Sequence, residues 1–480
     1  MYSKLIITNI GIKILFRFLI AYIYHQKTQI MHFKFFYPHN KHLHLPFFSY
    51  FCHTYKSNIN IMSNQKTTLN VQSETGKLEA VLLHYPGAEV ENMTPKNAQR
   101  ALYSDILNLS IAQKEYEQLY GVLNKHSEVF EIQKLLTELL KDDVQKELLV
   151  RKICMTENAM SYFDFLMQLP AIELARVLIE GLPAKIESLT EFLKDDFYAL
   201  FPLYNFYFTR DPGVAIGNNL LVCNMANKVR ARESYIIDAI FSSGMFFDAK
   251  IINANNFVGD KSLPTHIEGG DVLIVNEDIL LIGNGTRTSS QAIDSLIANL
   301  CTNKSGRKHI IVQQLPHSPE SFIHLDMIFT LLDTNIAMVY KPLILENNPY
   351  KTVHIQIDNG KVYKISTVTN IITALKNLDV DIRPIICGGN ADEWDQEREQ
   401  WHSGANFLSI APGKVMSYAR NVHTLEELSK NGFEITSAWD VINDKYDLNS
   451  SGKCVITIDG SELPRGGGGA RCMTMPLRRS

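Results

Sequence analysis

The sequence lacks any pair of cysteines at the spacing of a metal site or of a Cys-x-x-Cys motif. Its seven cysteines are scattered singly along 480 residues, and an odd number argues against a disulfide framework. An uninterrupted apolar run of about 20 residues, which a membrane-spanning helix needs, is also missing. The most apolar stretch, residues 5–24, contains Lys13 and Arg17. These absences predict a protein without a membrane span in a reducing compartment, for which the cytoplasm is the expected location.

Aspartate and glutamate are absent from residues 1–61, a segment that contains seven Lys or Arg. The remainder of the chain therefore holds 40 basic and 51 acidic residues, and such an acidic body argues against nucleic acid as a partner. The segment is interpreted either as an organelle-targeting sequence or as sequence upstream of a true start at Met62, which we favour. Under either interpretation we expect residues 1–61 to lie outside the fold.

The composition of 45% hydrophobic and 20% charged residues is that of an ordinary globular protein. A short apolar strand near residue 80 is followed, from about 95 to 200, by segments with Leu, Glu and Lys at helical spacing. We expect residues 62–112 to form the first part of a repeated α/β architecture and residues 113–200 to be a helical insertion. Residues 201–480 are expected to contain the remaining repeats.

A strand–strand–helix–strand unit recurs after Pro202. Four hairpins are indicated, one within residues 271–283 and three with turns at 217–219, 333–335 and 412–413. Helices are expected at 232–243, 289–300, 365–378 and 424–432, and third strands at 249–254, 309–315 and 433–438. Because each such unit buries its apolar face on its neighbours, the recurrence predicts a radial or stacked repeat.

Polar residues that a hairpin does not need stand at the openings of these units. Singly, each has an ordinary explanation, such as a turn whose Asp caps its own backbone or a hydrogen-bonded core histidine. Their recurrence at one point of the repeat favours a shared site, since a radial fold would bring these points to one axis. The residues are Asn205, Arg210 and Asp211, then Glu268 and Asp271, then His324 and Asp326 on what should be one strand face, and finally Cys472.

A cysteine with a histidine can perform nucleophilic catalysis with proton transfer. Three carboxylates in the same place would raise the pKa of the thiol, so they make sense only if the substrate is a cation. A planar guanidinium fits, because carboxylates bind its N–H donors in pairs. A cysteine peptidase would leave these acids unused, a metal site lacks a suitable His/Cys pair, and the glycine run before Cys472 does not continue as a phosphate-binding loop.

The chain resembles the arginine deiminases of the guanidine-modifying (pentein) superfamily from about Val71 to Leu477. The similarity is carried, in order, by "VQSETGKLEAVLLHYPGAEVENMTP", "NFYFTRDP", "VRARE", "IEGGDVL", "GTRTS", "HLDMIFTLLD", "REQWHSGANFLSIAPG" and "RGGGGARCMTMP". The resemblance implies a five-fold pseudo-symmetric α/β propeller of ββαβ modules with a helical insertion. It also implies hydrolysis of free L-arginine to citrulline and ammonia, with L-arginine as the partner and neither a metal nor an organic cofactor. A homo-oligomer is an open alternative to a monomer.

The resemblance assigns a role to each matching position. Cys472 corresponds to the nucleophile that forms a covalent amidino-cysteine intermediate, and His324 to the general acid and base. Asp211 and Asp326 correspond to the carboxylates that hold the guanidinium, with Glu268 beside them. The substrate-binding positions are Asn205, Phe208 and, for the α-carboxylate, Arg230 and Arg287.

The chain departs from the family pattern at several positions. Gly467 stands where many members have an arginine, five residues before the cysteine, and "HYPG" with Tyr85 replaces "HRPG". Residues 103–105 read "YSD" in place of "FDD", which affects the expected contacts of the lid. Agmatine deiminase and amidinotransferase are the alternatives within the superfamily, and a non-catalytic scaffold is the alternative of another class. The retained Cys472, His324 and three acids argue against the scaffold.

Overall fold

The computed structural model describes residues 66–480 except 95–102, 104, 187, 194–196, 258–259, 261–262, 303–306, 391 and 450–451. The extension expected at residues 1–61 lies outside the described residues. All of the elements below belong to one compact unit, residues 65–480. Within the described part of the chain, no helix combines the length and the hydropathy that crossing a bilayer requires.

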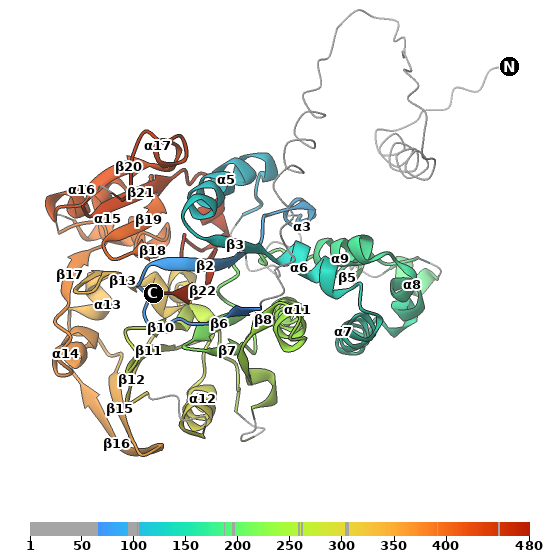
Figure 1. Ribbon diagram of the computed structural model, residues 1–480, viewed down its shortest axis with the longest axis horizontal. Coiled ribbons are helices and arrows are strands. Elements are labelled where there is room, and N and C mark those ends of the chain that lie inside the picture. Colours follow the sequence, from blue (N-terminus) through green and yellow to red (C-terminus); the bar gives the residue numbers. More distant parts are fainter. Residues whose placement is uncertain are drawn as a thin grey trace, which may run out of the picture. The chain divides into compact units, whose positions relative to one another are not determined.

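Five sheets, of three to five strands, each contain three neighbouring strands of one shared topology (Figure 1). In each, the middle strand pairs antiparallel with the strand before it and parallel with the strand after it. The first unit contains β2 (Leu78–Leu83), α5 (Leu109–His126), β3 (Glu128–Glu131) and β22 (Met475–Arg479); the second contains β6 (Gly213–Ile216), β7 (Asn219–Val222), α11 (Ala231–Ser242) and β9 (Lys250–Asn253).

The third unit contains β10 (Val272–Ile274), β11 (Ile279–Asn284), α12 (Ser290–Thr302) and β12 (His309–Gln314); the fourth contains β13 (Phe329–Asp333), β14 (Ile336–Val339), α14 (Ile371–Lys376) and β17 (Arg383–Ile386); the fifth contains β18 (Leu408–Ala411), β19 (Lys414–Tyr418), α16 (Val422–Lys430) and β21 (Cys454–Ile458). The helix in every unit connects the two parallel strands, as a parallel crossover requires. The predicted propeller of five ββαβ modules is therefore confirmed.

The beginning of the described residues meets the C-terminal strand in the first unit. The C-terminal strand β22 pairs antiparallel with β2 and so supplies the strand that this unit lacks at its own beginning. The N–H of Asn70 donates to the carbonyl of Leu477, and the N–H of Arg479 donates to the carbonyl of Asn70. These bonds hold the C-terminal strand in the ring, which places the residues just before it at the centre rather than in a frayed tail.

The hairpin turns lie where the sequence indicates. Gly217 turns β6 into β7 with φ of 62°, and Gly413 turns β18 into β19 with φ of 70°. Both angles belong to the left-handed region, which glycine adopts without the clash of a Cβ atom. Pairing of Ile216 with Asn219 leaves a two-residue loop, the length that matches the twist of antiparallel strands.

Two local predictions were wrong. The helix expected at 365–378 begins only at Ile371, because residues 365–368 belong to β16 (Lys361–Val368), which pairs with β15 (Thr352–Asp358) and extends the third sheet. The strand expected at 433–438 is β20 (Glu434–Ser437), but β21 lies between it and β19. In both places long-range strand pairing decides the outcome, which local spacing does not encode.

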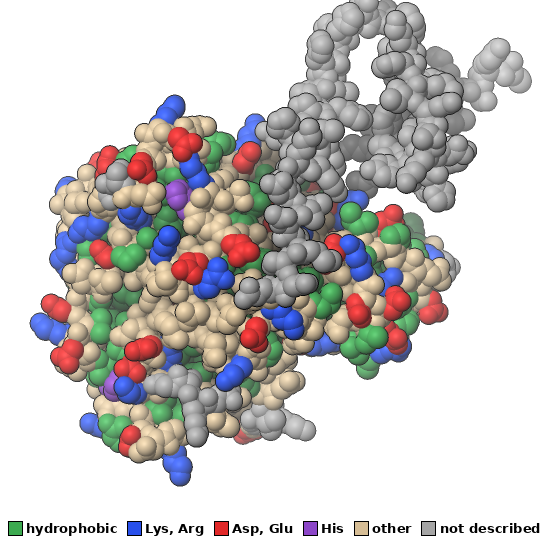
Figure 2. Space-filling model, viewed as in Figure 1, with side chains coloured by type: hydrophobic (Ala, Val, Ile, Leu, Met, Phe, Trp, Pro, Cys, Tyr) green, Lys and Arg blue, Asp and Glu red, His purple; other side chains and the backbone are tan. Residues whose placement is uncertain are grey.

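The helical insertion begins later than residue 113. Helix α5 and strand β3 complete the first unit, so the inserted segment follows Glu131. Figure 1 shows its helices on one side of the ring of sheets, and Figure 2 shows hydrophobic side chains on their surface, where Leu148 and Phe165 are exposed. Its elements are α6 (Ile132–Leu139), α7 (Asp143–Thr156), α8 (Phe163–Gln168), α9 (Ala171–Glu180), β4 (Leu182–Pro183), α10 (Leu189–Phe192) and β5 (Tyr198–Leu200).

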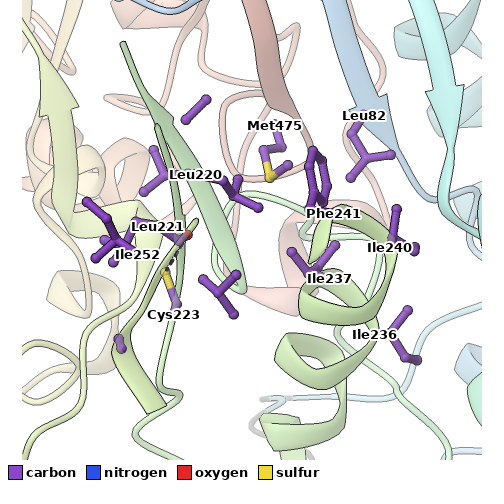
Figure 3. Close-up of a cluster of buried hydrophobic side chains, with 14 of the residues drawn as sticks. Leu82, Leu220, Leu221, Cys223, Ile236, Ile237, Ile240, Phe241, Ile252 and Met475 are labelled. Carbon is purple, nitrogen blue, oxygen red and sulfur yellow. Dashed lines mark hydrogen bonds between the residues drawn. The ribbon is translucent and has the colours of Figure 1, made fainter. Parts of the chain in front are cut away.

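The remaining described elements connect or cover these units. They are β1 (Thr67–Thr68), α3 (Ala88–Glu91), β8 (Phe247–Asp248), α13 (Lys341–Ile344), α15 (Glu393–Trp401) and α17 (Ala438–Ile442), with short 3-10 helices between them. The largest hydrophobic cluster lies between the helices and the sheets. In Figure 3, Ile237 and Phe241 of α11 point toward Leu220 of β7 and Met475 of β22. Both faces of β6 and β7 are buried, which explains their continuous apolar sequences.

Candidate active site

The openings of all five units converge on one pocket. Asp211 precedes β6, Glu268 precedes β10, His324 precedes β13, Asn406 precedes β18 and Cys472 precedes β22. The pocket encloses about 30 Å³, which is the scale of a single water molecule. Its lining consists of Asn205, Phe208, Asp211, Arg230, Arg287, Ile323, His324, the three glycines 466–468 and Cys472. All nine residues predicted for the site lie in it or touch its lining.

Cys472 lies at the base of this pocket and is 3% exposed. Its Sγ accepts a hydrogen bond from Nδ2 of Asn406 at 3.2 Å and lies 3.6 Å from Oδ2 of Asp326. Burial, together with the negative charges of Asp326 and Asp211, raises the pKa of the Cys472 thiol well above its usual range. The thiol is therefore protonated while no cation is bound beside it.

His324 lies between two carboxylates. Its Nε2 is 2.9 Å from Oε2 of Glu268, and its Nδ1 is 3.7 Å from Oδ1 of Asp211. Burial alone would lower the pKa of His324, but Asp211 and the hydrogen bond to Glu268 raise it to about 9. A Cβ atom on Gly270 would lie 2.5 Å from Nδ1 of this ring. The imidazole therefore packs directly on the glycine backbone and carries a proton at neutral pH.

Asp211 and Asp326 each present one engaged and one unengaged oxygen. Oδ2 of Asp211 accepts from Nη1 of Arg230, and Oδ2 of Asp326 accepts from Nη1 of Arg471, both at 2.7 Å. Within the described residues, Oδ1 of each aspartate is buried and has no hydrogen-bond partner. Buried acceptors of this kind normally have a partner. Two such oxygens beside Cys472 make a receptor for a donor-rich cation.

Glu268 is fully buried at the side of His324. Its Oε1 accepts from the N–H of Ala226 at 3.0 Å and lies 3.6 Å from Nη1 of Arg287. Burial would raise the pKa of this carboxyl, but Arg287 and His324 hold it below its usual range. Glu268 is therefore ionised and fixes both the orientation and the charge of His324.

The two arginines differ in how fully they are engaged. Arg230 is buried, and its Nε and Nη2 donate to Glu233 while its Nη2 also faces the carbonyls of Asn205 and Phe208. The side chain of Arg287 is 14% exposed, and its ion pair with Glu268 is longer, at 3.6 Å. The guanidinium of Arg287 is thus the more accessible cation in the pocket, and that of Arg230 also braces Asp211.

The glycine run approaches the aromatic wall closely. A Cβ atom on Gly466 would lie 2.1 Å from the hydroxyl of Tyr207, and one on Gly468 would lie 2.5 Å from the ring of Phe208. Side chains at these positions would therefore displace the wall of the pocket.

Two of the residues at which the chain departs from the family pattern near the lid have partners elsewhere in the fold. The hydroxyl of Tyr103 donates to the carbonyl of Tyr204 at 2.8 Å, and Asp105 forms an ion pair with Arg465.

His324 and Asp326 do not lie on a strand, contrary to the sequence prediction. Asp326 belongs to a 3-10 helix, Leu325–Met327, and His324 precedes that helix. The N–H of Leu325, between the two, donates to Oδ1 of Asp271 at 2.8 Å. Burial raises the pKa of Asp271 to about 6. This bond gives Asp271, left without a role by the sequence, a structural function in holding the turn.

Asn406 and Arg471 escaped the sequence analysis. Oδ1 of Asn406 accepts from the backbone N–H groups of Arg471 and Cys472, at 3.0 and 3.2 Å, while its Nδ2 also donates to the carbonyl of Asp326 at 3.2 Å. The sequence does contain a pattern that would have identified Asn406, because this residue precedes the first strand of the fifth unit just as the other polar residues precede the first strands of theirs. No comparable local signal marks the side chain of Arg471.

Asp211, Glu268 and His324 are the described residues whose ligand atoms lie close enough to hold a metal ion, within 4.8 Å of one another. The guanidinium of Arg230 contacts Asp211, and that of Arg287 faces Glu268. These positive charges oppose the entry of a second cation at the same oxygens. The donor set therefore fits a proton-transfer site with bound guanidinium groups better than a metal centre.

Comparisons with known proteins show which proteins this chain is similar to. The family model described as arginine deiminase matches residues 99–479. An arginine deiminase of Listeria monocytogenes is 33% identical over 428 residues, which cover 86% of this chain and 98% of that protein. One from Oenococcus oeni is 32% identical over 437 residues, covering 87% and 99%. Among solved structures, the N-terminal domain of ArgZ, an arginine dihydrolase from cyanobacteria, is 14% identical with a TM-score of 0.46, covering 84% of this chain and 98% of that one.

Proposed function

This chain belongs to the arginine deiminase family and catalyses the hydrolytic deimination of arginine, and we propose that the residues around Cys472 perform this reaction through a covalent cysteine intermediate. The observation that carries the proposal is that Asp211 and Asp326, whose charges both act on the thiol, each keep one buried oxygen without a partner. A guanidinium is planar and offers several N–H donors, so it can satisfy both oxygens at once. Its central carbon would then face Cys472.

Binding of the substrate cation creates the nucleophile. In the free protein the charges of Asp326 and Asp211 keep Cys472 protonated. A guanidinium between these carboxylates offsets their charge and lowers the pKa of the thiol, so that thiolate forms where the electrophilic carbon lies. The site is therefore reactive toward a bound cation and unreactive without one.

In the first step Sγ of Cys472 forms a bond to the guanidinium carbon. The resulting tetrahedral adduct then breaks one C–N bond, and the protonated His324 gives its proton to the departing nitrogen, which leaves as ammonia. The product on the enzyme is a thiouronium that retains the rest of the arginine. Glu268, bonded to Nε2 of His324, stabilises the imidazolium before the transfer.

In the second step neutral His324 removes a proton from water, and the hydroxide attacks the thiouronium carbon. The C–S bond breaks, the proton of the new hydroxyl returns Cys472 to the thiol, and neutral citrulline leaves. Summed over both steps, the arginine cation and water give citrulline and ammonium, because ammonia takes up the proton that the thiol released when the substrate bound. Each step uses a group that the other has left in the required protonation state.

The α-carboxylate distinguishes free arginine from agmatine. Arg287 lines the pocket and is partly exposed, and Arg230 lies across from it on Asp211. We assign recognition of the carboxylate to these two arginines, with Asn205 and Phe208 lining the substrate chain. An amidinotransferase would need a second amine beside the thiouronium, whereas hydrolysis of arginine needs only water in that place.

Three further points are proposals of the same kind. We place the protein in the cytoplasm, where the described cysteines, all of them free thiols, would persist. We assign no function to residues 1–61. A homo-oligomer stays a prediction, which light scattering on the purified chain would decide.

The test uses protein beginning at Met62, as wild type and as Cys472→Ser. Each is incubated with arginine, with agmatine and with an arginine-containing peptide, and both the ureido product and ammonia are measured. We expect product from free arginine with the wild type alone. Release from agmatine but not arginine would refute the substrate, and equal activity of Cys472→Ser would refute the nucleophile.

A further inference from the structure

Arg471, the residue before the nucleophile, reaches the carboxylate of Asp326. Its Nη1 donates to Oδ2 of Asp326 at 2.7 Å, the oxygen that lies 3.6 Å from Sγ of Cys472. The side chain is 1% exposed and takes no part in lining the pocket. Arg471 therefore contacts the guanidinium-binding carboxylate without access to the substrate.

Glu74 holds the other edge of the same guanidinium. Its Oε2 accepts from Nε of Arg471 at 3.1 Å and its Oε1 accepts from Nη2 at 3.0 Å, a two-point contact. Oε1 also accepts from the N–H of Ile274, while Nη2 of Arg471 donates to the carbonyl of Val272. Burial would raise the pKa of Glu74, but Arg471 and Arg210 lower it to about 2. The guanidinium plane is thus fixed on both sides by ionised carboxylates.

We propose that Glu74 and Arg471 form a positioning pair that orients Asp326 for the reaction. Arg471 holds Oδ2 of Asp326, which lies 3.6 Å from Sγ of Cys472, and so fixes the carboxylate beside the thiol while Oδ1 keeps its acceptor capacity unused. This inference rests on the proposed function, in which Oδ1 binds the guanidinium. The bidentate contact matters because a single contact would leave the guanidinium, and with it the carboxylate, free to rotate.

The pair also balances charge at the thiol. Cys472 is faced by Asp326 and Asp211, by His324 and by the hydroxyl-bearing rings of Tyr207 and Tyr418. Arg471 is the arginine that lowers the pKa of this thiol. Without that guanidinium the negative charge of Asp326 would raise the pKa of Cys472 further, and the backbone of Gly469 would offset only part of the rise. Loss of Arg471 should therefore change the pKa of the Cys472 thiol, which loss of a merely structural arginine would not do.

Arg479 provides a matched control in the same buried region. It is 3% exposed, and its Nη1 and Nη2 donate to the carbonyls of Gly76 and Ser409 at 2.6 and 2.7 Å, with no contact to Asp326. Its loss removes a buried arginine of the same size that makes two side-chain hydrogen bonds, whereas Arg471 makes four. Arg479 acts on Glu74 through its charge, but its hydrogen bonds go to backbone carbonyls and not to a carboxylate of the site.

The experiment compares Arg471→Gln, Arg471→Lys, Glu74→Gln and Arg479→Gln with wild type in the full chain. Four quantities are measured: kcat, KM for arginine, melting temperature and the pH dependence of alkylation of Cys472 by iodoacetamide. Mass spectrometry of the tryptic peptide isolates the reaction of Cys472 from that of the other cysteines. The alkylation profile needs no substrate, so it remains informative even if arginine is not hydrolysed.

We expect Arg471→Gln to lower kcat about 100-fold, the loss that misplacement of a reacting group by about 1 Å produces. Glu74→Gln should lower it about 10-fold, as supporting contacts typically do. Alkylation of Cys472 should shift to higher pH in Arg471→Gln. Arg471→Lys keeps the charge but not the two-point contact, so it should restore the alkylation profile while kcat stays low. Arg479→Gln should lower the melting temperature alone.

Two outcomes would overturn the inference. One is an unchanged kcat in folded Arg471→Gln; the other is an alkylation shift in Arg479→Gln as large as that in Arg471→Gln. If Arg471→Gln does not fold, Glu74→Gln decides, because it leaves the arginine in place. Full kcat in Glu74→Gln would show that Glu74 only stabilises the fold. If Cys472 of the wild type is alkylated with the expected pH dependence but the protein releases no ammonia, the proposed function is refuted. The effect of Arg471 on the pKa of Cys472 would still hold.

Discussion

His324 and Glu268 form a buried hydrogen bond, with Nε2 and Oε2 2.9 Å apart. Because the pKa of His324 is about 9 and that of Glu268 lies below its usual range, the bond joins an imidazolium to a carboxylate at neutral pH. The proton that ammonia needs on departure is therefore present before the substrate arrives. The same pair makes the stability of the protein depend on pH.

The first prediction concerns that dependence. The folded pKa of His324, about 9, lies above the ordinary value of about 6.5. The bond therefore contributes its full stability below pH 6.5, and the contribution is lost as pH rises through about 9. Urea unfolding of wild type should lose roughly 3 kcal/mol over this window relative to His324→Gln. Parallel pH profiles for the two proteins would contradict the assignment.

The second prediction concerns Arg287 as the anchor of the α-carboxylate. Arg287→Gln should lower kcat/KM for arginine about 10- to 100-fold, mainly through KM, since a charged hydrogen bond contributes about 1.5–3 kcal/mol. Residual turnover of agmatine should not change, because agmatine has no carboxylate. Arg176→Gln is the control, as Arg176 is an exposed residue of α9 that pairs with Glu180. Equal losses for both substrates would show that Arg287 acts on Glu268 and not on the carboxylate.

The third prediction concerns the approach of the glycine run to Phe208. Gly468→Ala would place a Cβ atom 2.5 Å from that ring, so the wall of the pocket must move, and kcat/KM should fall at least about 10-fold. Gly432→Ala is the control. Its φ is +84° with nothing within 4 Å, so it should cost about 1 kcal/mol of stability and no activity. Steady-state kinetics with thermal unfolding separates the two effects, and full activity of Gly468→Ala would disprove the steric account.

The fourth prediction concerns Asn406. Asn406→Asp keeps the acceptor for the N–H groups of Arg471 and Cys472 but replaces the donor to Sγ with a negative oxygen. We expect kcat to fall about 100-fold, as for other donors to a developing charge, and alkylation of Cys472 to require higher pH. Asn370→Asp at the start of α14 is the control, since Asn and Asp cap helices equally well. Unchanged alkylation in Asn406→Asp would remove the thiol contact from the mechanism.

Much of the site could be predicted because the fold repeats. Asp211, Glu268, His324 and Cys472 occupy equivalent points of successive units, and a ring of such units brings equivalent points together. The hairpins could also be predicted, because turn residues such as Gly217 and Gly413 determine the backbone conformation locally. Asn406 completes the pattern and could have been found by asking what opens the fifth unit.

The contacts that were missed join distant parts of the chain. Glu74 and Arg471 are 397 residues apart, and Asn406 and Cys472 are 66 apart. Residues 365–368 became a strand because β15 offered a partner, although their spacing suited a helix. Side-chain pairing across such distances depends on the packed ring and leaves no local period.

The sequence by itself determined the repeated unit, the polar residue at each opening and the cation that so many carboxylates around one cysteine require. The tertiary structure decided which carboxylate oxygens of Asp211 and Asp326 already accept hydrogen bonds from arginines of the protein. Arg230 and Arg471 each occupy one oxygen of an aspartate and leave the other oxygen buried without a partner. The reason is physical: residue types and their spacing set which charges can meet, but only the packed chain sets the orientation in which a buried carboxylate is held.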